Sequence, residues 1–422
     1  MFNTILLGFF LIGLTGISEA SAFFQEGQEM GYKQFKGRIM DARSKKPLVF
    51  ATLTVEGTNI STISNTEGEF ALKVPTSVKE GNVTVAFLGY KNKSIPLSQF
   101  KEDNNKIYMD VFVEALGEVS LSIPKNAGEL VRETLKRRGG NYFDDPTLMT
   151  AFYRETIKRR KKNVSLSEAV VNIYKTPYNS NKKDGVKIYK ARKSTDYSKL
   201  DTVALKLQGG PYNTLYVDIM KYPEYVFHER SLDKYHFNFE RSTRIDHRQI
   251  YIIDFIQKPG VKEQLYTGKL YIDAERKVLT KAIYSLNITN KYEAAKLFVR
   301  KKPVNAKVWP NKVDYRVDYR EKDGKWYYGY SNVLLEFKID WDKKLFNSVY
   351  SLSCEMAVTD WEKNLTNEMP RARDRVKTSI ILGDEAIGFA DSGFWGEYNI
   401  IEPEKSIESA IKKIQRQLRK SK

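Results

Sequence analysis

The fold of the amino-terminal part is decided by Lys36-Gly-Arg-Ile-Met-Asp41, by Lys46-Pro47-Leu-Val-Phe-Ala51-Thr-Leu-Thr-Val55-Glu-Gly57-Thr58, and by Ser64-Asn65-Thr-Glu67-Gly68-Glu-Phe70. Apolar and polar residues alternate along these runs, which is typical of strands with one buried and one solvent-facing side. Turn residues separate the runs. We therefore predict an antiparallel β-sandwich over residues 35–115.

Single residues within the runs have expected roles. Gly57 and Gly68 fall in turns, where we expect φ above zero. Pro47 is expected to begin an edge strand, because it lacks a backbone donor. Ala51 and Phe70 are expected to pack against each other across the sandwich.

A family pattern runs through the same segment. It consists of Gly37-x-x-x-Asp41, Pro47, Ala51, Val55-x-Gly57-Thr58, Asn65-x-x-Gly68-x-Phe70 and Leu88-Gly89-Tyr90. This pattern resembles the carboxypeptidase-regulatory-like domain, which also precedes many TonB-dependent transporters of the Gram-negative outer membrane. The resemblance implies a prealbumin- or immunoglobulin-like sandwich that is an accessory module without a catalytic site of its own.

The first residues have the pattern of an export signal. An apolar run over residues 1–17 is followed by Ala20-Ser21-Ala22, a small-x-small cleavage pattern. We predict a signal peptide over residues 1–22 and a disordered lead over 23–34. An uncleaved anchor is the alternative, although the run is short for a bilayer span. The expected location is the periplasm or the outer membrane.

Composition points to anionic partners. The formal net charge is +18, from 70 Lys and Arg against 52 Asp and Glu, and such a charge attracts anions over long range. An exported chain rarely meets nucleic acid, so the expected partners are anionic lipid headgroups, lipopolysaccharide or acidic glycans. The single Cys354 cannot form an internal disulfide, and its strand-like surroundings predict a buried structural thiol.

The middle of the chain is predicted to be a linker followed by a strand-rich domain. Residues 116–148 form the linker, with a helix over 124–138 that resembles a hinge element. Residues 149–400 form the strand-rich domain. The motif Phe152-Tyr153-Arg154-Glu155 at its start resembles one found in uncharacterised exported proteins of the same bacteria.

One hairpin of this domain also shows a resemblance. Gly268-x-Leu-x-Ile272-Asp273 is similar to the repeated hairpin of lipoprotein-carrier (Lol-type) half-barrels. That resemblance implies a larger curved antiparallel sheet with a few helices and an apolar concave face that binds acyl chains. The stretch from Gly209 to Tyr225 is expected either to close the mouth of a cavity in this sheet or to fill its core.

Two basic segments are candidate contacts for an anionic partner. The first is a hairpin run and the second is part of a basic amphipathic helix predicted over residues 401–422. Their residues are Lys158, Arg159, Arg160, Lys161, Lys162, Lys412, Lys413 and Arg416. The alternatives are a solvated hairpin tip for the first segment and a helix packed on the sheet for the second.

No catalytic, cofactor or metal site is predicted. The histidines His228, His236 and His247 match no zinc-binding spacing. Carboxylates are scattered through strands and turns, and no pair among them is singled out by its position: Asp218, Asp246, Asp254 and Asp273.

These patterns together predict a mainly β, non-catalytic binding or scaffold protein of the cell envelope, which holds a lipid or a glycan on a concave sheet. A hydrolase of envelope glycan or peptide is one alternative, and it requires two facing carboxylates roughly 5–10 Å apart. A structural partner of an outer-membrane transporter is the other.

Overall fold

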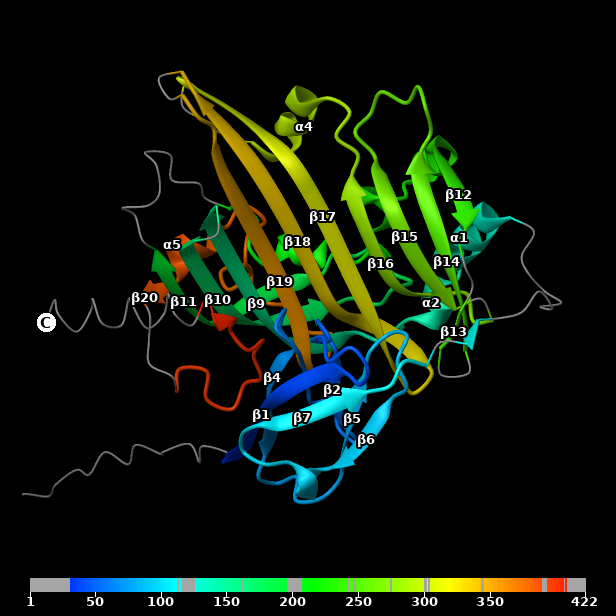
Figure 1. Ribbon diagram of the computed structural model, residues 1–422, viewed down its shortest axis with the longest axis vertical. Helices are drawn as coiled ribbons and strands as arrows, with labels where there is room; N and C mark the ends of the chain where they lie inside the picture. The colour runs from blue at the N-terminus through cyan, green and yellow to red at the C-terminus, as the bar shows by residue number, and fades with distance from the viewer. Residues whose placement is uncertain are drawn as a thin grey trace, which may run out of the picture.

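The structure, a computed structural model, describes residues 31–112, 114–115, 126–160, 162–195, 207–240, 243–245, 248–273, 275–299, 302, 304–342, 345–388, 393–405 and 407. It contains a small β-sandwich and a large curved sheet (Figure 1). The predicted signal peptide lies outside the described residues. Among the described residues, no helix has the length and apolar character needed to cross a membrane.

The amino-terminal part is the predicted β-sandwich. Its two sheets have the orders β4-β1-β7 and β3-β2-β5-β6. The bounds are β1 Tyr32–Asp41, β2 Thr52–Val55, β3 Ser61–Ile63, β4 Glu69–Pro75, β5 Asn82–Ala86, β6 Lys93–Pro96, the 3-10 helix η1 Leu97–Gln99 and β7 Asn105–Met109. Strands β1 and β7 pair in parallel, so the sandwich is not purely antiparallel.

Local details of the sandwich follow the sequence. Ala51 and Phe70 are buried in one core. Gly57 and Gly68 have φ of 75° and 74°, and a Cβ on Gly68 would lie 2.7 Å from the Ile39 carbonyl oxygen. The prediction of a disordered lead up to residue 34 is wrong at its end, because β1 starts at Tyr32 and pairs there with β4.

The larger part of the chain forms one sheet, which has 13 strands in the described residues. The main path is β20-β11-β10-β9-β19-β18-β17-β16-β15-β14-β13-β8, and β12 pairs with β14. The bounds are β8 Glu114–Ala115, β9 Thr147–Arg159, β10 Lys162–Lys175, β11 Gly185–Thr195, β12 Tyr235–Phe239, β13 Thr243–Ile245, β14 Arg248–Gln257, β15 Tyr266–Asp273, β16 Val278–Leu286, β17 Ala306–Lys322, β18 Lys325–Trp341, β19 Ser348–Lys363 and β20 Ile387–Gly388.

Short helices accompany this sheet. They are α1 Ala127–Lys136, α2 Arg138–Asn141, α3 Tyr212–Leu215, η2 Pro223–Tyr225, η3 Glu229–Lys234, α4 Lys291–Phe298 and α5 Leu382–Glu385. Helix α1 is the predicted linker helix, and the Asn126 side chain caps it. Leu130 and Val131 are buried in the core of the large sheet. The helix therefore packs as part of the domain, which differs from the expected hinge.

Residues 207–234, here called the plug, fill one face of the sheet. Leu215, Ile219 and Met220 in the plug are fully buried and belong to the main core cluster. The side of the sheet that contacts the plug is called the plug face, and Val317 and Tyr319 of β17 point to it. Of the two roles expected for Gly209 to Tyr225, the segment takes that of completing the core.

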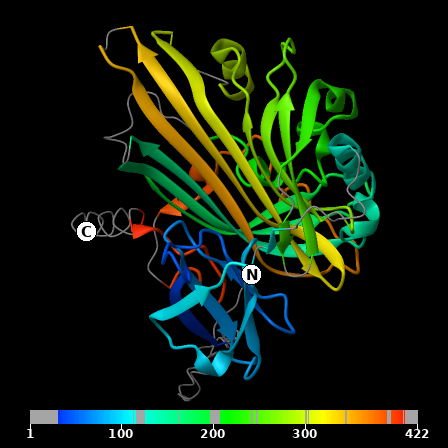
Figure 2. The same ribbon diagram turned by 45° about the vertical axis from the view of Figure 1, so that its right-hand side comes forward.

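The opposite side, the sandwich face, is covered in part by the sandwich and by residues 393–404, here called the tail segment (Figure 2). Trp395 and Ile401 of the tail segment pack with Ile63 of the sandwich and Phe152 of the sheet. Asn399 exchanges two hydrogen bonds with the backbone of Lys73, of 2.7 and 2.9 Å. The tail segment therefore covers the edge strand β4 and joins the two domains.

The beginning of the predicted carboxy-terminal helix is wrong. Residues 401–404 are not helical. The Ile401 carbonyl accepts a hydrogen bond from Arg154, and the Glu402 carboxylate pairs with Lys36 at 3.2 Å. These contacts engage residues 401 and 402 with β9 and β1, and the residues beyond 407 lie outside the described part of the chain.

Arg154 connects four segments on the sandwich face. Its guanidinium is 2.7 Å from Glu168 of β10 and 3.1 Å from Glu355 of β19, and it donates at 2.7 Å to the Ile401 carbonyl. Only 2% of the Arg154 side chain is exposed. A charge buried this deeply stays charged only because carboxylates surround it.

Replacing this residue should destabilise the whole protein. Arg154→Met leaves the buried Glu355 without its cation and leaves Glu168 with Arg192 alone, so we expect the free energy of unfolding to fall by about 3–5 kcal/mol. The matched control is Arg132→Met, which breaks the exposed Arg132–Asp233 pair of 2.6 Å and should cost less than about 1 kcal/mol. Urea unfolding checks both. Equal effects of the two changes would contradict the role assigned to Arg154.

On the plug face, Glu155 is buried beside Tyr153. The Tyr153 hydroxyl lies 2.7 Å from Glu155 Oε1 and 2.8 Å from the Gly210 carbonyl oxygen. One hydroxyl proton cannot serve both oxygens, and a carbonyl only accepts. If Glu155 is protonated, it donates to the Tyr153 hydroxyl, and that hydroxyl donates to the Gly210 carbonyl, so all three groups are hydrogen-bonded. Burial raises the pKa of Glu155 to about 7.

This carboxyl should make stability depend on pH. The pKa in the folded protein lies above the ordinary value of 4.5, so the stabilisation is complete below that value and is lost as pH rises to about 7. The loss should be on the order of 3 kcal/mol. Glu155→Gln should flatten this part of the curve of unfolding free energy against pH. Parallel curves for the two proteins would rule out a proton on Glu155.

Candidate functional site

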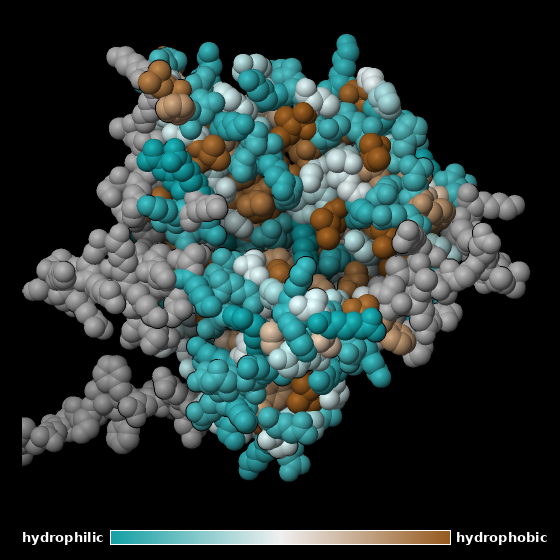
Figure 3. All heavy atoms as spheres, viewed as in Figure 1, coloured by the Kyte–Doolittle hydropathy of each residue, from teal (hydrophilic) through white to brown (hydrophobic). Residues whose placement is uncertain are grey.

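A cleft lies where the sandwich meets the large sheet. Its volume is about 620 Å³, and residues of both domains line it. The seam between the two domains is visible in Figure 3. On the sandwich side the lining includes Phe50, Glu56 and Phe87, and on the sheet side it includes Trp326 and Tyr330.

Strand β17 supplies the charged floor of the cleft. Arg316, Asp318, Arg320 and Lys322 occupy alternate positions of the strand and line the cleft. Side chains at alternate positions of a strand share one face. The intervening Tyr319 donates through its hydroxyl group to Asp218 on the plug face, at 2.9 Å.

The lining is rich in cations. It contains five basic side chains and three carboxylates: Arg248, Lys281, Arg316, Arg320 and Lys322, with Glu56, Asp318 and Glu321. Asp318 lies 2.5 Å from the Arg316 Nε and 3.5 Å from the Lys281 Nζ. Glu321 lies 2.6 Å from Arg248. The cations thus exceed the acids that neutralise them.

Burial and charge determine the protonation of these groups. Burial raises the pKa of Asp318, but Arg316 and Lys281 outweigh this effect and hold its pKa below the ordinary value. Burial lowers the pKa of Lys281, and Asp318 only partly offsets this. The Thr84 and Ser94 hydroxyls lower the pKa of Glu56. The carboxylates of Asp318 and Glu56 are therefore ionised at neutral pH.

Two donors in the lining are buried without a hydrogen-bond partner among the described residues. Arg320 Nη1 donates to the Ser61 Oγ at 2.7 Å and to the Val358 carbonyl at 2.9 Å. Arg320 Nη2 and the Trp326 indole Nε1 have none. A buried donor without an acceptor costs free energy, so a ligand rich in acceptors would be favoured here.

Aromatic rings of both domains stand against the cations. The Arg316 guanidinium lies 4.8 Å from the Phe50 ring centre, and the Lys281 Nζ lies 5.6 Å from that of Phe87. The Phe50 and Tyr330 rings are 4.7 Å apart. These contacts join the sandwich to the sheet and also provide ring surfaces beside the charged floor.

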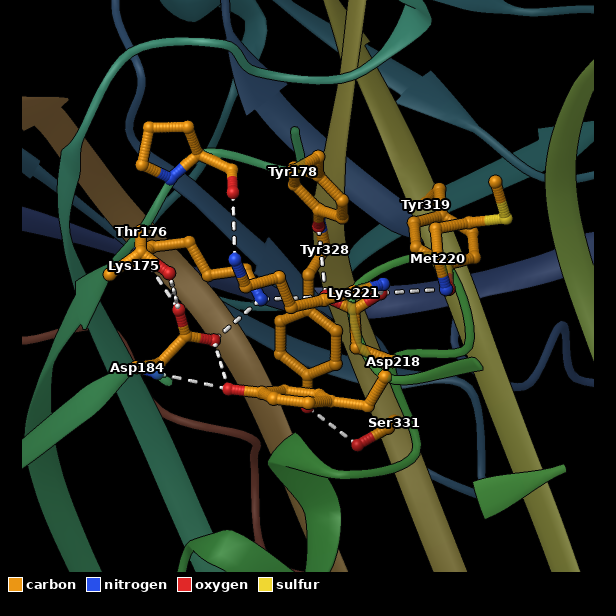
Figure 4. Close-up of polar contacts among 12 residues, drawn as sticks. Lys175, Thr176, Tyr178, Asp184, Asp218, Met220, Lys221, Tyr319, Tyr328 and Ser331 are labelled. Carbon is orange, nitrogen blue, oxygen red and sulfur yellow. Dashed lines mark hydrogen bonds and ion pairs between the residues drawn. The ribbon is translucent and has the colours of Figure 1, made fainter. Parts of the chain in front are cut away.

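The plug is tied to the sheet by a second, sealed polar network (Figure 4). Lys175 Nζ lies 2.8 Å from Asp184 and 2.7 Å from Asp218, and these side chains are at most 1% exposed. The hydroxyl groups of Tyr178 and Tyr222 donate to Asp218 and Asp184. Because each group is paired and solvent does not reach it, the network supports structure.

The structure does not bring the other predicted candidates together. Asp254 lies 3.8 Å from Lys269 on the exposed side of the sheet, and Asp273 accepts from the Arg276 backbone. His228 caps η3 through its Nδ1. In the described part of the chain, no group of three His, Cys, Asp or Glu could hold a metal ion. Asp246 and His247 lie outside the described residues.

The first basic segment lies at a hairpin tip away from the cleft. Arg159 and Lys162 face each other where β9 turns into β10, Arg160 and Lys162 are exposed, and Lys158 lies 3.7 Å from Glu404. The other candidate cations are outside the described residues: Lys161, Lys412, Lys413 and Arg416. Cys354 is fully buried in β19, as predicted, and burial raises its pKa well above the ordinary value.

Sequence reasoning missed the cleft. Its signal is the alternation Arg316-x-Asp318-x-Arg320-x-Lys322, in which the intervening residues are Val317, Tyr319 and Glu321. Such a strand carries one charged face, which is normally solvated. Only the position of the sandwich over this face makes it a site.

Three solved structures are similar to the larger part of the chain. A protein domain assigned to outer membrane lipoprotein sorting, from Vibrio parahaemolyticus, has 10% identity and a TM-score of 0.26, over 59% of this chain and 95% of that one. A DUF1329 family protein from Desulfovibrio piger has 10% identity and a TM-score of 0.24, over 57% and 92%. A LolA superfamily protein from Nitrosomonas europaea has 12% identity and a TM-score of 0.22, over 55% and 94%. These likenesses carry no information on ligand or activity.

No curated protein matches the chain. Residues 35–119 match the model of the CarboxypepD_reg-like domain. This match covers the sandwich and confirms the resemblance of its turn and core residues. The chain thus carries a CarboxypepD_reg-like domain, joined to a strand-rich part whose structural neighbours include LolA-like and DUF1329 proteins.

Proposed function

We propose that this chain is an exported, non-catalytic binding protein of the cell envelope that holds an acidic glycan in the cleft between its two domains. The observation that carries the proposal is the cleft lining. Cations outnumber carboxylates there, and the Arg320 Nη2 and Trp326 Nε1 donors are buried without partners. An acidic sugar supplies negative charge, many acceptors and ring faces that stack on aromatic side chains.

The proposed ligand site is the cleft between the two domains. It differs from the apolar concave face of the sheet, which the sequence predicts as a site for acyl chains. The plug occupies the plug face with fully buried Leu215, Ile219 and Met220. The cleft, in contrast, combines charges with aromatic rings, which suits a polar ligand better than an acyl chain.

The chemistry of the cleft favours binding over hydrolysis. A glycosidase uses one carboxyl with a raised pKa as its general acid. Asp318 has a lowered pKa and Glu321 is shared by Arg248 and Arg276. The raised pKa of Glu155 belongs to the plug face, where Tyr153 and the plug cover the group.

The envelope location is supported by the start of the chain. The apolar run of residues 1–17 and the Ala20-Ser21-Ala22 pattern have the form of an export signal. The net charge of +18 favours anionic partners in that compartment.

Calorimetric titration with oligogalacturonate fragments tests the proposal. We expect binding that weakens as salt is raised. Trp326→Phe removes one unpaired donor from the cleft, so affinity should fall about tenfold. Lys322→Gln removes a half-exposed cation of the lining and should weaken binding with a smaller salt dependence.

The matched control is Trp361→Phe. The Trp361 indole Nε1 is also buried without a partner, but this residue does not line the cleft. Affinity should therefore stay unchanged. Equal losses for the two tryptophan variants, or equal binding of a neutral oligosaccharide, would place the glycan elsewhere and overturn the proposal.

A further inference from the structure

Apolar side chains protrude from one end of the large sheet. Val304, Leu345 and Phe346, here called the apolar tip, are 102%, 97% and 81% exposed. Leu345 and Phe346 lie between β18 and β19, and Val304 lies just before β17. Figure 1 shows the end of the sheet at which β17 begins and at which β18 leads into β19, and Figure 3 shows hydrophobic side chains at that end. Single exposed leucines are common on proteins, but protruding side chains at one end require a reason.

Pairing within the sheet brings these loops to the same end. Ala306 at the start of β17 pairs with Trp341 at the end of β18, and the Asp342 amide donates to the Asn305 carbonyl at 3.2 Å. Because Ile339 of β18 pairs with Ser348 of β19, the loop with Leu345 and Phe346 stands beside the loop with Val304.

The basic β9–β10 hairpin ends beside the start of β19. Tyr350 of β19 pairs with Arg159, and the Arg160 amide donates to the Val349 carbonyl at 3.1 Å. Arg160 and Lys162 are exposed there, and Val349, to which the Arg160 amide donates, follows Phe346 by three residues. Lys302 is also exposed and reaches the Ala306 carbonyl.

Charge at this end is mainly positive. Arg160, Lys162 and Lys302 stand against the exposed Asp342. Protruding apolar side chains surrounded by cations have the composition of surfaces that enter anionic membranes.

The backbone of Arg160 supplies an independent observation. Its φ is 56°, a left-handed conformation that costs an arginine free energy and suits glycine or asparagine. The two-residue turn between Arg159 and Lys162 would therefore be more stable with glycine there. An arginine at a position that disfavours it indicates that its positive charge contributes to function, for example by binding an anion.

We propose that the apolar tip inserts into the surface of an anionic phospholipid bilayer while Arg160, Lys162 and Lys302 bind the headgroups. The large sheet would then stand with this end on the membrane. The glycan cleft lies away from it, so this inference does not depend on the ligand of the cleft.

A bilayer fits this surface better than a protein partner does. A stable protein interface needs roughly 800 Å² on each side, with a packed and fairly flat centre. The apolar tip offers three side chains on two loops that project almost fully into solvent. Such loops can enter lipid one by one, and headgroup phosphates match the neighbouring cations without a precise geometry.

Vesicle co-sedimentation tests the proposal. The chain from Phe23 onward is used, because the apolar run of residues 1–17 would bind lipid itself, and the described fold begins only at Gly31. The probes are vesicles of phosphatidylethanolamine with phosphatidylglycerol, and vesicles of phosphatidylcholine alone. We expect salt-sensitive binding to the anionic vesicles and weak binding to the neutral ones.

Two variants separate the apolar and the charged contributions. Leu345→Ser with Phe346→Ser should weaken binding to anionic vesicles more than tenfold, because two apolar side chains no longer enter the lipid. Arg160→Gly should weaken it about fivefold while the melting temperature stays equal or rises, because the backbone strain is relieved. A purely structural role for Arg160 would instead leave vesicle binding unchanged.

The matched control is Leu365→Ser. Leu365 is 88% exposed and follows the opposite end of β19, where Lys363 pairs with Thr147. Its replacement should leave vesicle binding unchanged. Absence of vesicle binding by the parent chain, equal losses for Leu365→Ser and the tip variant, or binding that appears only with an added membrane protein would each overturn the proposal.

Discussion

The arrangement of the two domains depends on one buried ionic group. Arg154 lies among Glu168, Glu355 and the Ile401 carbonyl on the sandwich face. Buried charges are costly, so the group exists only when three strands and the tail segment are all in place. It therefore links the sheet to the tail segment. The tail segment in turn binds the sandwich through the side chain of Asn399, which is hydrogen-bonded to the backbone of Lys73.

This link determines where a ligand can bind. The plug covers the plug face and is held by the sealed network of Lys175, Asp184 and Asp218. The opposite face is the one that the sandwich leaves partly open. A charged strand face and aromatic rings from a second domain then enclose a cleft that neither domain could form alone.

Much of the fold could be predicted from sequence. The alternation of apolar and polar residues in β1 and β4 determines which side chains enter the sandwich core, among them Phe35, Ile39 and Phe70. Glycines at positive φ mark the turns of the sandwich. Errors occurred where tertiary contacts outweigh local preference. Residues 401–404 are not helical, and Ile401 and Glu402 among them contact Arg154 and Lys36 instead. Helix α1 packs because its stripe meets the core of the large sheet.

The motif Phe152-Tyr153-Arg154-Glu155 shows the same limit. Its alternation predicts that neighbouring side chains point to opposite faces. The sequence cannot say that one face meets the plug and the other meets the tail segment, because Gly210 and Ile401 are far away along the chain. The export pattern, the sandwich and the strand-rich class can be read from the amino-acid sequence, since these depend on local periodicity and turn chemistry. Which face is filled, which charges are buried and where the cleft opens follow from contacts between segments that are distant along the chain, and local patterns do not encode such contacts.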